Sequence, residues 1–254
     1  MGVIFKVKGK NIQQTLVLIK PDALLYSLTG FIIERVSAIL NPIIAASKVV
    51  RVSRELAEAH YANIKGKPFF ENTINYIMGE LHYPDQPEKR RVLSIVYEGP
   101  EIVEKIKQYF GPTNPKDCKK LAKKEGIITL RAQLSYTDYS VNQEELIDNA
   151  VHASGTSQEA EGEIKLWFEP GDFPKQHRLF PYMESKEHFY YLSNTLPEKR
   201  PQIVSYYVEG SKCIIAPGNL VWKIDYMDLI AYRDGKEPSQ PISHIIAKYR
   251  LKNI

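Results

Sequence analysis

The sequence contains little cysteine. Cys118 and Cys213 are the only two among 254 residues. Two isolated cysteines provide neither a disulfide framework nor a cysteine motif for a metal. Because disulfides accumulate in proteins of oxidising compartments, this low content favours a reducing compartment, and we expect a cytoplasmic protein.

Long apolar runs are also missing. Polar residues interrupt the first segment of the chain early. A transmembrane helix needs about 20 consecutive, mostly apolar residues. We therefore expect no signal peptide, no membrane-spanning helix and no membrane partner.

The chain has no large excess of charge of one sign. Its 34 Lys and Arg residues against 30 Asp and Glu residues leave a net charge of +4, and its basic clusters, at residues 89–91 and 119–124, are short. Recognition of nucleic acid uses an extended basic surface with interleaved aromatic residues, so we do not expect nucleic acid as a partner. Apolar and charged contents of 43% and 25% are ordinary for a globular protein with a sizeable core.

The most informative stretch runs from Asn149 to Phe168. His152 stands shortly before a helix start, which is marked by the capping-box spacing of Thr156 and Glu159. Beyond that start, apolar residues recur at helical spacing and predict a buried stripe; they are Ala160, Ile164, Trp167 and Phe168. Glu163 lies beside this stripe, so its carboxylate can point inward.

This arrangement makes His152 a candidate nucleophile or base. The first N–H groups of a helix are free and its dipole is positive there, so phosphate would be favoured close to His152. Glu163 is available to orient the imidazole ring. The same pattern also fits a histidine that only caps the helix, and this stretch by itself leaves both interpretations open.

The order of elements predicts the fold class. Apolar patterns and turn signals give the order strand, helix, strand, helix pair, strand, helix, with a last strand just before His152. We therefore predict an α+β protein with a ferredoxin-like sandwich, in which an antiparallel four-stranded sheet carries helices on one face. Residues 116–125 are basic, and we predict a loop there.

The last third of the chain continues with apolar, tyrosine-rich segments. We predict a helix from Ser185 to Tyr191, a β-hairpin formed by residues 203–208 and 212–216, and further elements at 220–232 and 242–251. The segment is too apolar for a disordered tail but short for a domain with its own core. We expect domains 1–168 and 169–254, the second an α/β extension that packs on the first or on a neighbouring subunit.

Several collinear motifs make the chain resemble the nucleoside diphosphate kinases. Asn-x-x-His-x-Ser at residues 149–154 precedes Glu-Ile-x-x-Trp-Phe at 163–168. In the same order as in the family come Lys-Pro-Asp at 20–22, His-Tyr at 60–61, Lys-Pro-Phe-Phe at 67–70, Gly-Pro-Thr-Asn-Pro at 111–115 and Thr-Leu-Arg at 129–131. The matches span about residues 13–168, and several collinear motifs are far more specific than one.

The resemblance implies an enzyme that transfers the γ-phosphate of a nucleoside triphosphate to a nucleoside diphosphate by ping-pong kinetics. Catalysis would use His152 as the phosphorylated nucleophile, Glu163 to orient it and Ser154 to support Glu163. The residues implied for substrate binding are Lys20, Tyr61, Phe69, Lys107, Thr113, Arg131 and Asn149. Among these, Phe69 would stack on the base, and Asn149 would hold ribose and phosphate.

The resemblance also implies partners and a cofactor. ATP and other nucleoside tri- and diphosphates would be the substrates, Mg²⁺ would bridge their phosphates, and the chain would form a homo-oligomer. No protein metal ligand is predicted, because the ion would be held through phosphate.

The chain departs from the family pattern at several positions. Lys107 replaces a usual arginine, Ala153 a usual glycine, and Gly155 a usual aspartate that would reach magnesium through water. Lysine pairs with phosphate but lacks the bidentate fork of arginine. These departures keep open a second hypothesis, a nucleotide-binding assembly or regulatory protein of the same fold with weak or no turnover.

Overall fold

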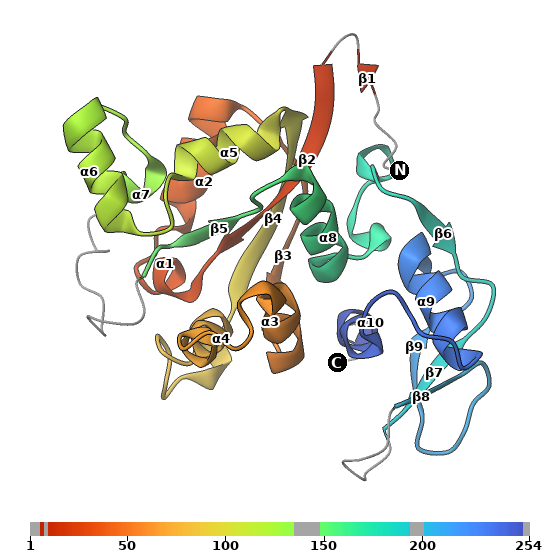
Figure 1. The fold of residues 1–254 in the computed structure, drawn as a ribbon. Helices are drawn as coiled ribbons and strands as arrows, with labels where there is room; N and C mark the ends of the chain where they lie inside the picture. Colours follow the sequence, from red (N-terminus) through yellow and green to blue (C-terminus); the bar gives the residue numbers. More distant parts are fainter. Residues whose placement is uncertain (1–5, 8–9, 135–147, 194–200, 251–254) are drawn as a thin grey trace. The chain divides into compact units, whose positions relative to one another are not determined.

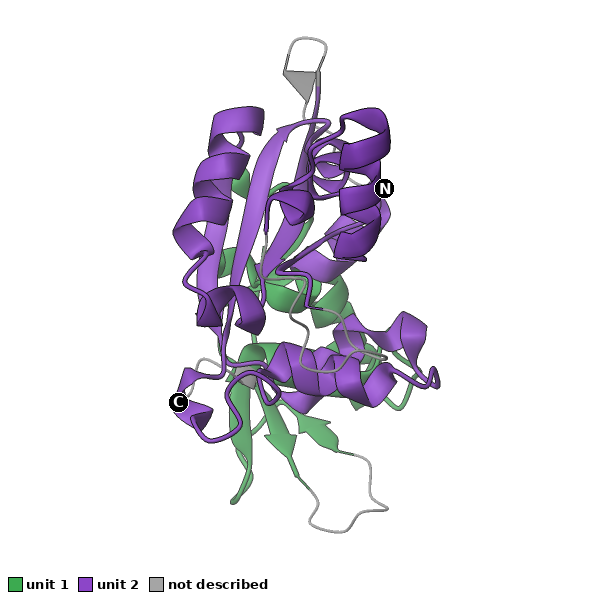
Figure 2. Cartoon of the chain, turned by 90° about the vertical axis from the view of Figure 1, so that its left-hand side faces the viewer, with its two compact units in different colours: residues 1–3, 165–254 green, residues 4–164 purple. Residues whose placement is uncertain are grey.

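The computed structural model describes residues 6–7, 10–134, 148–193 and 201–250. The chain forms two compact units (Figure 2). The N-terminal unit comprises residues 4–164, and the C-terminal unit comprises residues 165–254 together with residues 1–3.

The N-terminal unit is built on an antiparallel sheet (Figure 1). Its strands are β1 (Lys6–Val7), β2 (Lys10–Ile19), β3 (Ile43–Val50), β4 (Val92–Pro100) and β5 (Val151–Ala153). The spatial order is β5-β2-β4-β3, and the short β1 pairs with the start of β2. This antiparallel order confirms the predicted ferredoxin-like α+β fold.

Helices connect and cover these strands. They are α1 (Pro21–Leu25), α2 (Thr29–Leu40), α3 (Arg54–His60), α4 (Phe70–Met78), α5 (Ile102–Phe110), α6 (Pro115–Glu125), α7 (Leu130–Gln133) and α8 (Ser157–Trp167), with 3-10 turns at Ala62–Ile64 and Pro87–Lys89. Helix α3 begins at the predicted cap, because Ser53 accepts a hydrogen bond from the Leu56 N–H at 3.2 Å.

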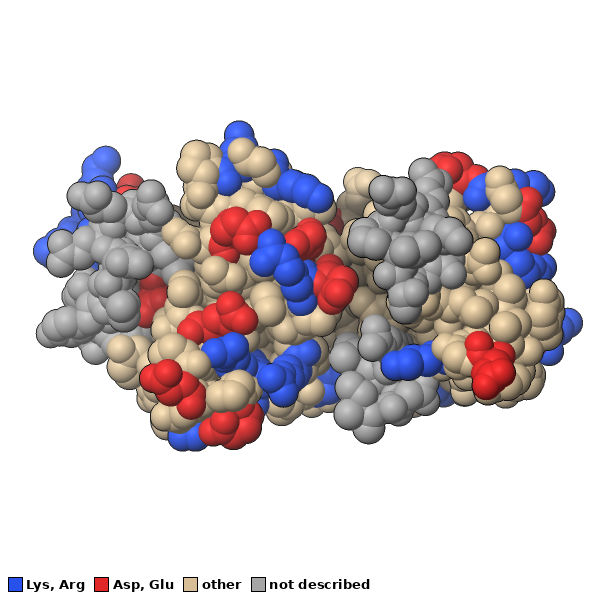
Figure 3. Space-filling view, turned by 90° about the horizontal axis from the view of Figure 1, so that it is seen from below, with Lys and Arg blue, Asp and Glu red and all other residues tan. Residues whose placement is uncertain are grey.

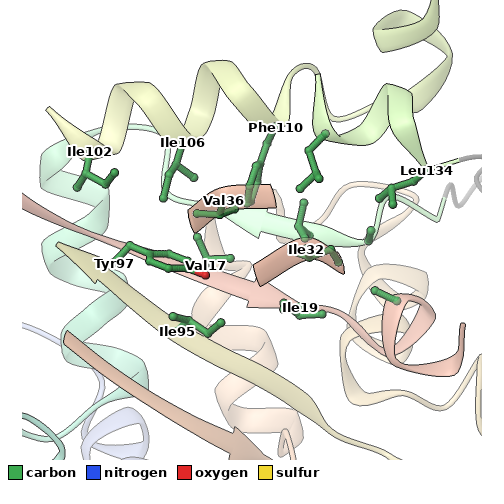
Figure 4. Close-up of a cluster of buried hydrophobic side chains, with 14 residues drawn as sticks. Val17, Ile19, Ile32, Val36, Ile95, Tyr97, Ile102, Ile106, Phe110 and Leu134 are labelled. Atoms are coloured by element: carbon green, nitrogen blue, oxygen red, sulfur yellow. The ribbon is translucent and has the colours of Figure 1, made fainter. Parts of the chain in front are cut away.

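The main core lies between the sheet and helices α2 and α5 (Figure 4). Alternate residues of β2, among them Val17 and Ile19, face Ile32 of α2 and Ile106 and Phe110 of α5. The intervening residues Leu16 and Leu18 point to the opposite face and are also fully buried. Both faces of the sheet are therefore covered at β2, which explains its uninterrupted apolar run; the prediction of helices on one face only was wrong in this respect.

One local prediction for this unit was wrong. Residues predicted as a basic loop form helix α6. The Asn114 side chain caps it by accepting a hydrogen bond from the Lys116 N–H at 2.9 Å, Pro115 occupies the first turn, and Gly126 ends the helix in the left-handed region. These start and stop signals outweigh the low apolar content of the segment.

The C-terminal unit contains two small sheets. Strand β6 (Tyr182–Glu184) pairs with β10 (Leu220–Trp222), whereas β7 (Phe189–Leu192) lies between β8 (Gln202–Val204) and β9 (Lys212–Ile215). The predicted hairpin of the last two strands was wrong, because both pair with β7 and not with each other. The predicted helix from Ser185 to Tyr191 was also wrong, because its last residues, from Phe189 on, form strand β7.

This unit has a hydrophobic cluster of its own, contrary to our expectation. Helices α9 (Lys223–Arg233) and α10 (Ile242–Arg250) contribute Leu229 and Ile245, which are fully buried together with Phe189 of β7. Short 3-10 turns at Pro170–Asp172 and Lys175–His177 precede the first strand. Across the described ranges of both units, no helix has the length and apolar character needed to cross a bilayer.

The backbone conformation of Gly111 leads to a prediction about stability. It ends α5 with φ 78° and ψ −173°, a conformation that is nearly restricted to glycine, and an added Cβ would lie 2.7 Å from Thr129 Cγ2. We expect Gly111→Ala to lower the free energy of unfolding by about 2–4 kcal/mol, from backbone strain plus overpacking. Urea denaturation followed by circular dichroism measures this loss.

Gly30→Ala serves as the matched control. Gly30 lies in the first turn of α2, and an added Cβ would meet no atom within 4 Å. We expect this variant to be neutral or slightly stabilising, because alanine favours helix over glycine. Equal stability of the two variants would contradict the conformational argument.

Candidate active site

His152 lies at the centre of strand β5. This strand pairs with the end of β2, and His152 is opposite Leu18 in the register. The next residues leave the strand, and Thr156 starts helix α8 by accepting a hydrogen bond from the Glu159 N–H at 3.1 Å. The predicted helix start is therefore confirmed, and the imidazole stands between a strand end and a helix N-terminus.

Glu163 brings three side chains together. His152 Nε2 lies 3.0 Å from each carboxylate oxygen of Glu163, and the Ser154 hydroxyl donates to Glu163 Oε2 at 2.6 Å. Ser154 is fully buried and also accepts a hydrogen bond from the Leu16 N–H at 3.3 Å. The structure thus places all three residues predicted for catalysis in one hydrogen-bonded cluster.

The protonation of this cluster follows from its contacts. Burial acts to raise the pKa of Glu163, but the hydrogen bond and electrostatic interaction with His152, followed by smaller contributions from His60 and Ser154, outweigh it, so the pKa lies below its usual value. The carboxylate is therefore ionised at neutral pH and can only accept hydrogen bonds. His152 Nε2 must then carry a proton, which leaves the lone pair on Nδ1.

His60 belongs to the same cluster, although we did not include it among the predicted site residues. Its ring lies edge-on to His152, with centroids 4.5 Å apart, and its Nδ1 is 3.8 Å from Glu163 Oε1. Burial first, and then the charge of His152, lower the pKa of His60 to about 3, so the ring is neutral. Its position beside Tyr61 in a recognised motif was the signal that could have identified it.

Lys20 and Asn149 form a second group of the site. Lys20 follows β2 directly, is buried, and donates from Nζ to Asn149 Oδ1 at 2.8 Å. Its ammonium also lies 5.0 Å from the centre of the Tyr76 ring. Burial lowers the pKa of Lys20 to about 8, partly opposed by Asp22, so the amine is mostly charged at neutral pH and titrates just above it.

The backbone between Asn149 and His152 is strained. Ala150 has φ 63°, in a region that alanine rarely adopts. Three hydrogen bonds hold this turn: the Ala150 N–H donates to Asp22 Oδ2, the Lys20 N–H to the Ala150 carbonyl, and the Val151 N–H to the Asn149 carbonyl. Such strain is often found where side chains must be aimed at a ligand.

Arg131 is oriented differently from our expectation of a phosphate ligand. Its buried guanidinium donates to backbone carbonyls on two segments, including those of Gly111, Pro112, Asn149 and Val151. It therefore connects the loop after α5 to the turn before His152. Its positive charge nevertheless remains close to Lys20, whose pKa it lowers after the larger effect of burial.

Lys107, Gly155 and Glu159 surround the loop after Ser154. Lys107 Nζ donates to the Gly155 carbonyl at 3.0 Å, and the Gly155 N–H donates to Glu159 Oε2 at 2.9 Å. An added Cβ at Gly155 would lie 2.5 Å from that oxygen. An exposed carboxylate thus stands next to the position where the resemblance led us to expect an aspartate, and carboxylate oxygen is a ligand type that Mg²⁺ accepts.

The remaining predicted binding residues differ in exposure: Tyr61 is half-buried, whereas Phe69 and Thr113 lie at the surface. The Tyr61 ring packs edge-on against His60, with centroids 4.7 Å apart. Burial and the charges of Glu163 and Asp22 raise the pKa of Tyr61, which keeps its hydroxyl a hydrogen-bond donor. Phe69 is 42% exposed, and Thr113 is also exposed, so both side chains are accessible to a ligand.

The site offers one further group of metal-binding atoms. His60, His152 and Glu163 each contribute a ligand atom, and these atoms lie within 4.8 Å of one another. All three residues are members of the hydrogen-bonded histidine cluster described above. We therefore assign it to orientation of the imidazole.

The arrangement is suited to nucleophilic chemistry on an anion. The imidazole of His152 is held by a carboxylate on one nitrogen, and cationic side chains and a helix N-terminus lie close by.

Comparison with known proteins identifies the family. The family profile "Nucleoside diphosphate kinase" matches residues 13–173. A nucleoside diphosphate kinase of Pyrococcus furiosus is 35% identical over 180 residues, which cover 71% of this chain and 94% of that protein. Nucleoside diphosphate kinase 1 of Zea mays is 32% identical and covers 68% of this chain and 99% of its own length.

Solved structures agree with the sequence matches. A nucleoside diphosphate kinase from Borrelia burgdorferi, determined as a transition-state mimic with vanadate and ADP, matches with a TM-score of 0.52 and 26% identity. The match covers 65% of this chain and 91% of that one. This chain belongs to the nucleoside diphosphate kinase family of enzymes.

Proposed function

We propose that the chain transfers the γ-phosphate of a nucleoside triphosphate to a nucleoside diphosphate through a phosphohistidine at His152. The observation that carries the proposal is the position of His152, bound to Glu163 through Nε2 at 3.0 Å. One site that accepts a phosphoryl group and then returns it predicts ping-pong kinetics.

The nucleophile is Nδ1 of His152. Its lone pair forms the new bond to the γ-phosphorus, while the bond between that phosphorus and the bridging oxygen breaks and the diphosphate leaves with the electron pair. The ring becomes positively charged in this step, and the ionised Glu163 carboxylate stabilises that charge through the Nε2 proton. In the second half-reaction, a terminal oxygen of another diphosphate forms a bond to the same phosphorus, while the bond between phosphorus and Nδ1 breaks and its electron pair returns to the His152 ring.

Phosphoryl transfer depends mainly on positioning and charge stabilisation. Lys20, Tyr61 and Thr113 would hold the phosphates. Lys107 would do so from the loop after Ser154, and Arg131 would contribute its positive charge and the bracing of the turn that carries Asn149. The amide of Asn149 would hold ribose and phosphate.

Phe69 would stack on the base. Because every base has a π-face, such stacking tolerates different nucleotides and suits a broad substrate range. The solved relatives include one with ADP and another, from Halobacterium salinarum, in complex with CDP, which agrees with this proposal.

Mg²⁺ is the metal that this chemistry favours. The exposed carboxylate of Glu159, beside the Gly155 N–H, would hold a water molecule of the hydrated ion. When bound, the ion neutralises part of the phosphate charge. Positioning of the nucleophile remains the task of Glu163 and Ser154.

The chain is also proposed to form a homo-oligomer. Among the described strands, β3 pairs with β4 alone, so its other edge is open. It exposes Ile43, Ile44 and Val49 at 52%, 46% and 63%. An open apolar edge favours pairing with another chain, and a second copy of this chain fits it.

On the face drawn in Figure 3, acidic and basic side chains are intermingled, which favours neither nucleic acid nor another strongly charged partner.

We expect ATP with a labelled γ-phosphate to label wild-type protein and the label to pass to added GDP. His152→Ala should abolish labelling while leaving the circular dichroism spectrum unchanged, because it removes the nucleophile only. Gel autoradiography of the isolated protein measures this. Nucleotide binding without labelling in the wild type would favour a regulatory binding protein, and label on the variant would exclude His152.

We expect Glu163→Gln to slow phosphorylation by about 100-fold or more while weakening ADP binding less than about threefold. The neutral amide no longer stabilises the charge that develops on the ring, which matters most in the transition state. Single-turnover kinetics and calorimetric titration separate the two quantities. Glu161→Gln, on the same helix, is the control, and equal losses of rate and affinity in Glu163→Gln would contradict the assigned role.

We expect Val49→Lys to lower the molecular mass of the particle in solution, because a charge on an open strand edge opposes pairing. Light scattering measures the mass, and Ile128→Lys, another exposed apolar position at 66%, is the control. A wild-type monomer would show the proposal to be wrong.

The C-terminal residues 169–254 are proposed to serve assembly and to form no second catalytic site. They expose Tyr206 and Tyr207 at 68% and 67%, a composition suited to contacts. The same light-scattering measurement on a Tyr206→Ser, Tyr207→Ser protein shows whether this surface takes part. An unchanged mass with lost phosphoryl transfer would assign these residues to the active site.

A further inference from the structure

A buried pair outside the proposed mechanism adjoins the phosphate-binding group. His82 Nε2 lies 2.9 Å from Asp148 Oδ1, and the two side chains are only 4% and 7% exposed. A buried charge is costly unless it is paired and hydrogen-bonded. The burial of this pair therefore calls for an explanation, whereas a histidine–carboxylate contact exposed to solvent would not.

The loop that carries His82 is rigidly braced. Arg90 donates from Nε to the Tyr83 carbonyl at 2.9 Å and from Nη2 to the Pro84 carbonyl at 2.7 Å. The same guanidinium pairs with Glu80 at 3.3 Å. Arg90 thus holds the backbone just after His82 and the Glu80 side chain just before it, which fixes the loop that presents His82 to Asp148.

Asp148 is directly connected to the proposed phosphate site. The next residue, Asn149, accepts the Lys20 ammonium at 2.8 Å and donates its N–H to the Tyr76 hydroxyl at 3.3 Å. The Tyr76 ring in turn lies 5.1 Å from the His82 ring and 5.0 Å from Lys20 Nζ. These five residues form one continuous buried network; they are Lys20, Tyr76, His82, Asp148 and Asn149.

We propose that Asp148, oriented by His82, is a positioning residue that holds Asn149 and the Lys20 side chain in place for nucleotide phosphate. The inference rests on the proposed function, because it takes Lys20 as a phosphate-binding group. Neither His82 nor Asp148 needs to touch the nucleotide, so both act through Lys20 and Asn149.

The charges around Lys20 give the sign of the effect. Burial and the guanidinium of Arg131 from α7 favour the neutral amine, whereas the carboxylates of Asp22 from α1 and Asp148 favour the ammonium. His60 from α3 also faces Lys20, but it is neutral. With the pKa of Lys20 at about 8, the amine is charged below that pH and neutral above it, so small changes in this balance alter its charge near neutral pH.

Removing the Asp148 charge should therefore shift the titration of Lys20 downward. Asp148→Asn keeps an oxygen that can accept from His82, so the geometry is retained while the charge is lost. The charged fraction of Lys20 at pH 8, which is close to its pKa, should therefore fall, and ADP affinity should fall with it. At pH 6.5 Lys20 stays mostly charged in both proteins, so the affinity should be almost unchanged there.

The experiment follows Lys20 directly in the full-length protein without nucleotide. Proteins labelled with ¹³C at the lysine Cε are titrated by NMR, with Lys20 assigned by a Lys20→Met variant. We expect a lower midpoint in Asp148→Asn and an unchanged one in Asp85→Asn, an exposed carboxylate three residues from His82. A midpoint that does not move in folded Asp148→Asn protein would overturn the proposal.

Variants of His82 provide a second, independent arm. His82→Ala removes the side chain that holds the Asp148 carboxylate in place, so it should also lower the Lys20 midpoint, whereas His82→Gln retains a hydrogen-bond donor and should restore it. This pair decides the question if Asp148→Asn does not fold. Equal midpoints in both His82 variants would exclude an orienting role for His82.

Calorimetric titration with ADP at pH 6.5 and pH 8 completes the test. A loss confined to pH 8 in Asp148→Asn supports the proposal, and an equal loss at both values contradicts it by indicating a purely structural role. A shifted midpoint with unchanged ADP affinity would contradict phosphate binding by Lys20, and so the proposed function, while leaving the coupling of Asp148 to Lys20 intact. A fixed midpoint with normal ADP binding would leave the proposed function standing and remove this inference.

Discussion

The hydrogen bonds between Glu163 and His152 are the interaction on which the site depends. They join strand β5 to helix α8, and Ser154 fixes the same carboxylate from the β5 side. The geometry requires β5 to pair with β2 in its observed register, because a shift by one residue would turn the imidazole to the other face of the sheet. It also requires α8 to begin at Thr156, because a different start would rotate Glu163 away from the ring. The sheet and the helix cap together place the Glu163 carboxylate on Nε2 of His152. In the neutral ring the lone pair then lies on Nδ1.

Around this pair the protein buries charges of both signs. Lys20 and Arg131 provide positive charge, Asp22 and Asp148 balance it, and each makes hydrogen bonds within the described structure. An isolated buried charge would be prohibitive, whereas a connected set is tolerated and holds its members in fixed positions. The left-handed conformation of Ala150 persists for the same reason, since backbone and carboxylate hydrogen bonds hold the turn on both sides. The site is therefore organised before a ligand arrives, which lowers the ordering needed on binding.

The sequence predicted the fold and the parts of the site that follow from local patterns. The spacing of Thr156, Glu159 and Glu163 defined a helix start and an inward carboxylate, and both are present. Contacts that depend on distant segments were not predictable in this way. Nothing local indicates that β7 separates the strands at 202–204 and 212–215, or that Arg131 donates to carbonyls more than 15 residues away. Helix α6 was missed although its cap residues were visible, because apolar periodicity was given more weight than start and stop signals. His82 and Asp148, 66 residues apart, could be related only by the fold.

The boundary between the two units falls within helix α8, the helix that carries Glu163. Helix α8 runs from Ser157 to Trp167, whereas the C-terminal unit begins at Lys165, so one helix belongs to both. In an α-helix the carbonyl of residue 163 accepts the N–H of residue 167. Trp167 is buried, and the adjoining Phe168 carbonyl accepts the indole N–H of Trp222 within the C-terminal unit. If that unit unfolded, the last turn of α8 would lose the packing that fixes it and would fray, as unpacked helix ends do. Glu163, which orients His152, therefore stands one turn before Trp167 on the helix that the two units share.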